Sequence, residues 1–109
     1  MRILKFIVAN NSIVQDPKCD FSGLFPGRNK NVIARFDFSS EWDTSAKVVA
    51  FWSILGNEYT PQLLDEKSTC LIPSEALERP AFKMQVLGKT KHKQMETNKL
   101  IVYQYGGKT

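Results

Sequence analysis

The sequence predicts an all-β protein, an immunoglobulin-like β-sandwich of seven to eight short strands with one short helical turn near residues 73–78. Two observations predict this fold. Short apolar runs rich in Val, Ile and Phe are separated by turn residues along the whole chain. In addition, no apolar pattern is long enough for the helix of a βαβ unit. With 109 residues, we expect one domain, 1–109. A small closed barrel is the alternative architecture.

The N-terminal run, residues 2–9, is mostly apolar and contains no strand breaker. This predicts a first strand that is buried on both faces. Asn10 and Asn11 are turn residues because Asn tolerates left-handed backbone conformations. Residues 13–15 predict a short second strand, and Pro17 places it at an edge or a bulge.

The central stretch predicts two strands joined by a corner. Residues 32–38 alternate between apolar and polar side chains, which is typical of a half-buried strand. Residues 39–41 make the corner, and residues 47–52 have the low polarity of a central strand. Trp42 is too large to remain exposed at the corner. We expect its ring to close one end of the core, with the indole N–H donating to a nearby carbonyl.

The second half supplies the remaining strands, which we place at residues 59–64, 69–72, 82–86 and 99–105. Pro61 weakens the first of these. Pro73 is suited to the first position of a helical turn over residues 73–77, and Pro80 ends this turn. Residues 88–98 predict a polar hairpin loop.

Charge is concentrated in one segment. The chain has a net charge of +4, and the stretch from Lys83 to Lys99 holds five lysines and one glutamate, so it accounts for the whole excess. Two cysteines, Cys19 and Cys70, are too few for a disulfide scaffold, and we expect free thiols. The apolar start is interrupted by Lys5 and has no small-residue cleavage site. We therefore expect synthesis in a host cytoplasm and no association with a membrane.

Two irregular segments are the candidate contact sites. In residues 21–30 the apolar side chains either fold back as a plug over the core, which we prefer, or form a patch for a partner. Around residues 89–93, alternate lysines either form a solvated hairpin tip or bind an acidic partner. The candidate partner-binding residues are Phe21, Leu24, Phe25, Arg28, Lys89, Lys91, His92 and Lys93.

No pattern of catalytic chemistry is present. His92 has no set of converging metal ligands, no serine lies in a nucleophile elbow, and the acidic residues are typical of turns. We expect no catalytic residue, no cofactor and no metal, and the lack of aromatic residues between the lysines argues against nucleic acid as a partner. Tyr59, Tyr103 and Tyr105 are candidates for a sugar-binding platform. For the face of Tyr103 and Tyr105 we prefer a core or inter-subunit position.

Three pieces of the chain together carry a resemblance. They are the strand-corner-strand stretch of residues 32–51, the CLIPSEAL stretch within residues 64–77, and residues 82–107, which end in Gly106-Gly107. In these three pieces the chain resembles a family of short proteins from phages and prophages of Gram-positive bacteria. The proteins of this family are similar to the immunoglobulin-like N-terminal module of baseplate and tail proteins. Pro80-Ala81 stands where that pattern has a glycine. The family pattern contains no catalytic residue.

The resemblance implies a non-enzymatic phage structural or accessory protein, a tail or baseplate module that acts through protein–protein contacts. Its partners would be other virion subunits or further copies of itself, and it would be located in the virion. One alternative is a small phage inhibitor of a host enzyme or defence complex that uses the basic hairpin 89–98. Another is a carbohydrate-binding module for the host wall.

Overall fold

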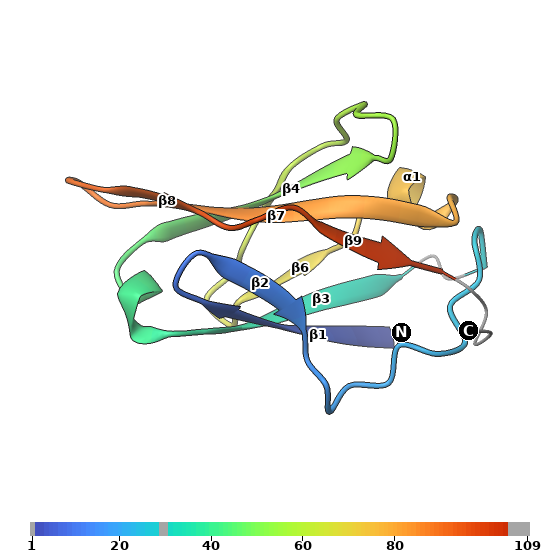
Figure 1. Cartoon of the computed structure of the whole chain (residues 1–109), viewed down its shortest axis with the longest axis horizontal. Coiled ribbons are helices and arrows are strands. Elements are labelled where there is room, and N and C mark those ends of the chain that lie inside the picture. The colour runs from blue at the N-terminus through green and yellow to red at the C-terminus, as the bar shows by residue number, and fades with distance from the viewer. Residues whose placement is uncertain (1, 29–30, 105–109) are drawn as a thin grey trace.

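The computed structural model describes residues 2–28 and 31–104, and within these ranges the chain forms nine strands in two sheets (Figure 1). Sheet A contains, in spatial order, β2 (Ser12–Gln15), β1 (Arg2–Ala9), β3 (Val32–Phe38) and β6 (Thr69–Leu71). Sheet B contains β5 (Gln62–Leu63), β4 (Ala46–Ser53) and β7 (Ala81–Lys89), and the far edge of β7 pairs with β8 (Gln94–Glu96) and β9 (Leu100–Tyr103).

The connectivity is that of an immunoglobulin-like sandwich with one departure. The chain crosses from sheet A to sheet B between β3 and β4, and both the β3–β6 pair and the β4–β7 pair are antiparallel. However, β1 runs parallel to β3 and forms a hairpin with β2. The predicted fold class is confirmed. The strand count exceeds the prediction because part of the polar hairpin 88–98 pairs with β7 as β8.

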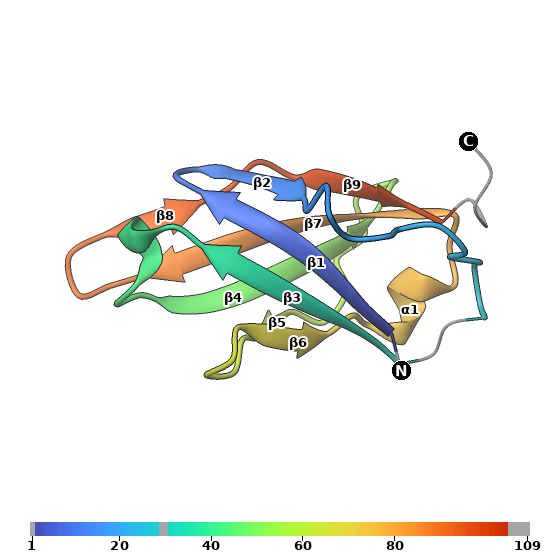
Figure 2. The ribbon, with the colours of Figure 1, turned by 90° about the horizontal axis from the view of Figure 1, so that it is seen from below.

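The core lies between the two sheets, and its residues follow the alternation of the strands. Leu4, Phe6 and Val8 point inward from β1 and meet side chains such as Phe51 and Phe82 of sheet B. The expectation that residues 2–9 are buried on both faces is wrong, because Ile3 and Lys5 are exposed and no further layer of the described residues covers the outer side of sheet A (Figure 2).

Trp42 closes one end of the sandwich, as predicted. It ends the 3-10 turn η1 (Ser40–Trp42), is fully buried, and donates its indole N–H to the carbonyl of Asn10 at 2.9 Å. The ring lies against Gly88 of β7. A Cβ atom at position 88 would approach Cζ3 of Trp42 to 2.6 Å, so only glycine fits there. The corner is thus joined to both sheets.

Several element boundaries differ from the predictions. Of residues 59–64 only Gln62–Leu63 form a strand, because Pro61 removes a backbone donor just before them. The helix α1 is Ser74–Leu77, and Pro73 is its N-cap residue and not its first helical residue. The last strand ends at Tyr103, and residue 105 lies outside the described residues. No helix in the described part of the chain is long and apolar enough to cross a membrane.

The close approach of Gly88 and Trp42 gives a prediction about stability. Gly88→Ala should lower the free energy of unfolding by about 1–3 kcal/mol, because the added methyl group overpacks the ring. Urea denaturation measures the loss. Trp42→Phe removes the contacting ring atoms, and it should also be destabilising because the Asn10 carbonyl loses its donor.

The double variant is the control for this interpretation. If the methyl–ring clash is the cause, Gly88→Ala should cost less in the Trp42→Phe background than in the wild type. Strict additivity of the two losses would contradict it.

Candidate functional site

The first half of the segment 21–28 is part of the core. Phe21 packs edge-on against Phe6 with 5.6 Å between ring centroids, and Leu24 is 1% exposed. The guanidinium group of Arg2 fixes this loop by donating to the carbonyls of Asp20 and Ser22. The plug interpretation is therefore confirmed for Phe21 and Leu24: Leu24 is fully buried, and Phe21 is half-buried against the core.

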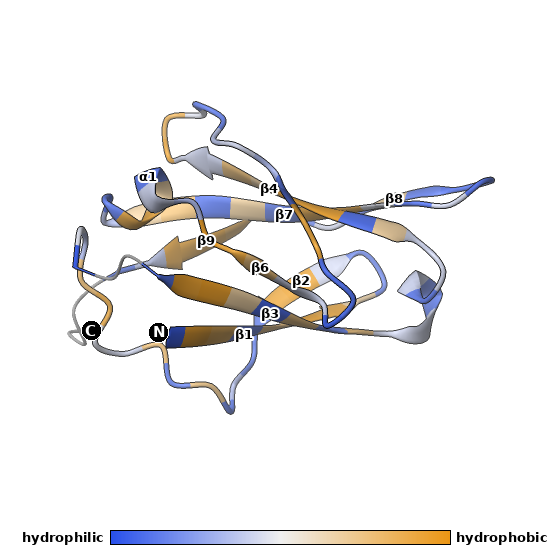
Figure 3. Cartoon of the chain, turned by 180° about the vertical axis from the view of Figure 1, so that it is seen from behind, coloured by the Kyte–Doolittle hydropathy of each residue, from blue (hydrophilic) through white to orange (hydrophobic). Residues whose placement is uncertain are grey.

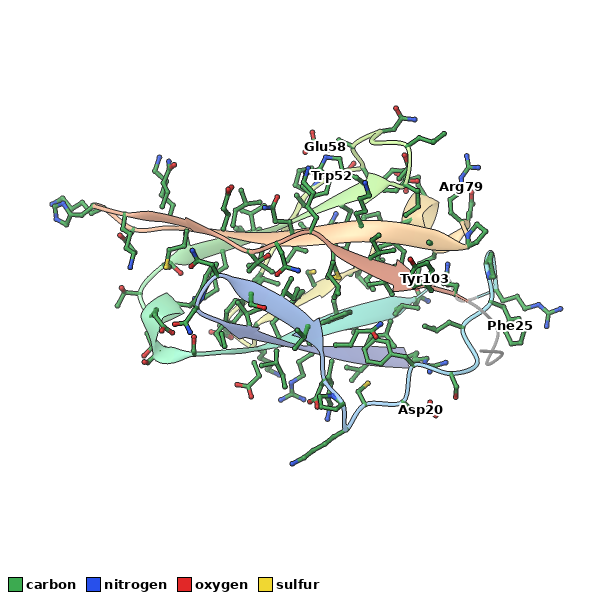
Figure 4. The ribbon with its side chains drawn as sticks, in the orientation of Figure 1. Asp20, Phe25, Trp52, Glu58, Arg79 and Tyr103 are labelled. Atoms are coloured by element: carbon green, nitrogen blue, oxygen red, sulfur yellow. The ribbon has the colours of Figure 1, made fainter. Side chains whose placement is uncertain are left out.

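The second half of this segment lies on the surface. Phe25 is 40% exposed, and the guanidinium carbon of Arg28 lies 5.1 Å from the centroid of its ring. Phe25 and Arg28 flank a turn at Gly27, which has a φ of +76°, and both side chains lie on the surface. Figure 4 shows Phe25 pointing away from the end of the sandwich. A cation stacked on an aromatic ring is a compact amphipathic feature.

The basic hairpin lies at the opposite end of the molecule. Lys89, Lys91, His92 and Lys93 are all exposed, and the tip is closed by a hydrogen bond from the Thr90 N–H to the Lys93 carbonyl at 2.8 Å. Figure 1 shows the β7–β8 hairpin extending past the body of the sandwich. The structure therefore does not bring the two sets of candidate residues together. Partner binding by either set stays a prediction.

A row of apolar side chains crosses the outer face of sheet A. Ile3 of β1, Ile33 of β3 and Leu71 of β6 are direct cross-strand neighbours. Ile3 is 44% exposed, Ile33 is half-buried, and Leu71 is 53% exposed. Sequence reasoning missed this row, although Ile3 and Ile33 are out of phase with the core residues on either side of them.

The outer face of sheet B carries a second apolar row, formed by Leu63, Val48 and Leu87 on β5, β4 and β7. Beside it lies a cavity of about 630 Å³. The lining residues of the cavity are Ala46, Val48, Leu87, Gly88, Lys89, Gln94, Met95 and Glu96.

A loop that sequence reasoning did not single out projects from the same sheet. Residues 54 and 55 form its tip, and Leu55 is 92% exposed, more than any other large apolar side chain of the described residues. Figure 3 shows this hydrophobic tip beside polar loop residues. Its signal in the sequence is two aliphatic residues immediately before Gly56, in a position where polar residues are usual.

Among the described residues, the aromatic side chains on or beside sheet B are only partly open to solvent. The ammonium group of Lys99 lies 4.5 Å from the centroid of the Trp52 ring and occupies one of its faces. Tyr59 packs against the core, whereas Tyr103 is 46% exposed and does not belong to the core. Of the two positions expected for Tyr103, the inter-subunit one stays a prediction. Tyr105 lies outside the described residues. Figure 4 shows Trp52 above the sheet near Glu58.

The shifted carboxyl pKa values originate in turns. The Thr69 hydroxyl donates to Asp65 at 2.7 Å and lowers the pKa of that carboxyl, and the Thr69 backbone N–H adds to the effect. Ser22 lowers the pKa of Asp20 in the same way. These shifts are accounted for by hydrogen bonds that fix loops. Within residues 2–28 and 31–104, no three His, Cys, Asp or Glu side chains are grouped closely enough to hold a metal ion.

The cysteines are free thiols, as predicted. Cys70 points into the core from β6, and burial raises the pKa of its thiol to about 12. Cys19 is half-buried beside β1, where the Lys5 N–H lies 3.4 Å from its Sγ atom.

Comparison with known proteins gives no relative: no protein-family model, no curated protein and no solved structure matches the chain.

The two thiols should differ in reactivity. With a pKa of about 12, only about one Cys70 side chain in ten thousand is a thiolate at pH 8, and burial also excludes reagents. Iodoacetamide at this pH should therefore modify the native protein once, at Cys19, and the denatured protein twice, as mass spectrometry can measure. In the Cys19→Ser variant the native protein should remain unmodified. Rapid modification at both positions in the native state would contradict the burial and the raised pKa of Cys70.

Proposed function

We propose that this chain is a non-enzymatic interaction module of a phage tail or baseplate, which acts by binding other virion subunits. The observation that supports this proposal most is the apolar row of Ile3, Ile33 and Leu71 on the outer face of sheet A. Three neighbouring aliphatic side chains that remain outside the core are typical of a surface that another protein covers.

The position of the row adds to its suitability for binding. It ends on β6, an edge strand that consists of Thr69, Cys70 and Leu71 and has no charged residue. Figure 2 shows β6 beside β5, the edge strand of sheet B, which is also uncharged and holds the 72% exposed Leu63. Charged side chains are a common protection of edge strands against association. The two edge strands β5 and β6, which lie side by side, both lack such charged side chains.

Burial of the row adds to the free energy of binding. Burial of one exposed leucine or isoleucine contributes about 1.5–3 kcal/mol. Leu71 is the most exposed member of the row, and it lies on the edge strand with Ile33 as its neighbour. A phage setting follows from the resemblance to the immunoglobulin-like module of tail and baseplate proteins, and the sandwich connectivity agrees with that resemblance at the level of the fold.

The test uses incorporation into particles. A tagged copy of the chain is expressed in a Gram-positive host during phage production, and particles purified on a density gradient are probed for the tag. Leu71→Lys should reduce incorporation by at least about tenfold, because it replaces a buried apolar contact by a charge on an edge strand. The folded state should be retained, since Leu71 is 53% exposed.

Val14→Lys is the matched control, because Val14 is similarly exposed on β2 at the opposite flank of sheet A. This variant should be incorporated like the wild type. Wild-type protein that is absent from particles and binds none of their isolated proteins would refute the proposed function.

A second candidate function is inhibition of a host enzyme or defence complex through the basic hairpin. The observation in its favour is the extension of the hairpin beyond the sandwich, with Lys89, Lys91 and Lys93 all exposed. Such a tip can enter an acidic groove.

Charge reversal tests this candidate. If expression of the wild-type chain slows growth of the host, replacement of Lys89, Lys91 and Lys93 by Glu should abolish the effect, because the tip would then repel an acidic groove. Replacement of the exposed Lys5, Lys18 and Lys67 by Glu changes the net charge equally and should leave the effect in place. Equal loss of the effect in both triple variants would argue against the hairpin as the binding site.

A further inference from the structure

The strand β6 forms one edge of sheet A, and some of its backbone groups face away from the sheet (Figure 2). The residues just before and after β6 bond to β3, through the Ser68 carbonyl and the Ile72 N–H. Because every second residue of an antiparallel strand bonds to its neighbour, the N–H and C=O groups of Thr69 and Leu71 point outward. Outward groups on an edge strand are a template for pairing with a strand of another protein molecule.

Asp65, in the turn that leads from β5 to β6, occupies the outward groups of Thr69. The carboxylate of Asp65 accepts the Thr69 N–H at 2.9 Å, and the Asp65 N–H donates to the Thr69 carbonyl at 3.2 Å. The second carboxylate oxygen accepts the Thr69 hydroxyl at 2.7 Å. One residue thus takes up both of the backbone groups with which Thr69 could bind a further strand.

The turn holds the carboxylate in this position. The Lys67 N–H donates to the Asp65 carboxylate at 2.9 Å, and the Ser68 N–H donates to the Asp65 carbonyl at 3.0 Å. Ser68 has a φ of +60°, a left-handed conformation that costs free energy in a residue other than glycine. This conformation reverses the chain within a few residues, so that Thr69 returns to the side of Asp65.

The rest of the β6 edge is short. Leu71 is the next residue with outward backbone groups, and Pro73, two residues further on, has no N–H to donate. With Asp65 in place, an added strand could bond to β6 at Leu71 alone. Without Asp65 it could bond at Thr69 as well. The strand has no charged residue of its own that would oppose such pairing.

We propose that Asp65 blocks the edge of β6 against strand addition, because its carboxylate and N–H occupy the outward backbone groups of Thr69. The contact is an autoinhibitory device within the fold, and the inference stands without the proposed function. It also describes how a partner of the apolar row on sheet A would bind, namely through the side chains of the row and not through backbone pairing along β6.

Asp20 offers a matched comparison. Its carboxylate accepts the Ser22 N–H at 2.8 Å in a similar turn, but the residues around it belong to no strand. Asp65, in contrast, binds the first residue of an edge strand. Replacement of Asp20 therefore removes the same charge and the same kind of turn contact without changing a strand edge.

Sedimentation equilibrium over a range of concentrations tests the proposal, since the only strands available in the purified protein are those of further copies. Asp65→Ala should self-associate at least about tenfold more tightly than the wild type, because Thr69 gains free groups for interchain hydrogen bonds. Asp65→Asn should behave like the wild type, since its amide oxygen can still accept the Thr69 N–H. Asp20→Ala should leave the association unchanged. Asp65 is exposed, so its replacement should leave the core intact.

Hydrogen exchange measured by NMR locates the contact. In Asp65→Ala the Leu71 N–H should exchange more slowly as the protein concentration rises, because an added strand accepts a bond from it. The double variant Asp65→Ala, Thr69→Glu should lose the added association. Its new carboxylate lies on the edge strand itself, where Arg35 of β3 is the direct cross-strand neighbour.

Three results would overturn the inference. The first is an Asp65→Ala variant that associates no more tightly than the wild type, and the second is an association that leaves the exchange of the Leu71 N–H unchanged. The third is faster exchange throughout β4 and β7, which would show that unfolding and not strand addition causes the association. The proposed function is tested separately, by incorporation of the wild type and of Leu71→Lys into particles, so either proposal can fail without the other.

Discussion

The burial of Trp42 at the corner between the sheets is the interaction on which the rest of the sandwich depends. Its ring packs against Gly88 of β7 and lies 5.5 Å from the Phe38 ring of β3, and its indole N–H holds the turn between β1 and β2 through Asn10. One side chain therefore fixes a strand of each sheet and the hairpin at the edge. Because the ring fills the space over Gly88, the start of the β7–β8 hairpin has a fixed position relative to the corner.

The packing of Trp42 at this end of the sandwich helps to determine which side chains lie on the outer faces of the two sheets. With the corner, β3 and β7 fixed, alternation along each strand decides which side chains are left outside the core. On sheet A these include the row that ends at Leu71, and on sheet B they include Val48 and Leu87 beside the cavity. A sandwich of two layers has no third layer to cover such residues. Apolar side chains therefore remain partly exposed on both outer faces.

The sequence was sufficient to predict the fold wherever a single segment showed a clear signal, such as apolar–polar alternation or a large aromatic side chain. The alternation in residues 32–38 and the size of Trp42 were sufficient for β3 and for the corner. For residues 2–9 the pattern was misleading, because a continuous apolar run can reflect either burial on both faces or an exposed apolar row. The distinction depends on whether another layer covers the sheet, which no local pattern contains.

Most of the candidate surfaces could not be predicted for the same reason. Ile3, Ile33 and Leu71 are far apart in sequence and become a row only through the parallel pairing of β1 with β3 and the antiparallel pairing of β3 with β6. In the segment 21–28, the sequence could not show which aromatic residue would turn inward. Arg2, distant in sequence, binds the loop carbonyls on either side of Phe21, whose ring packs on Phe6, whereas Phe25 is 40% exposed. The exposed lysines of the hairpin could be predicted, since charge alone keeps them in solvent.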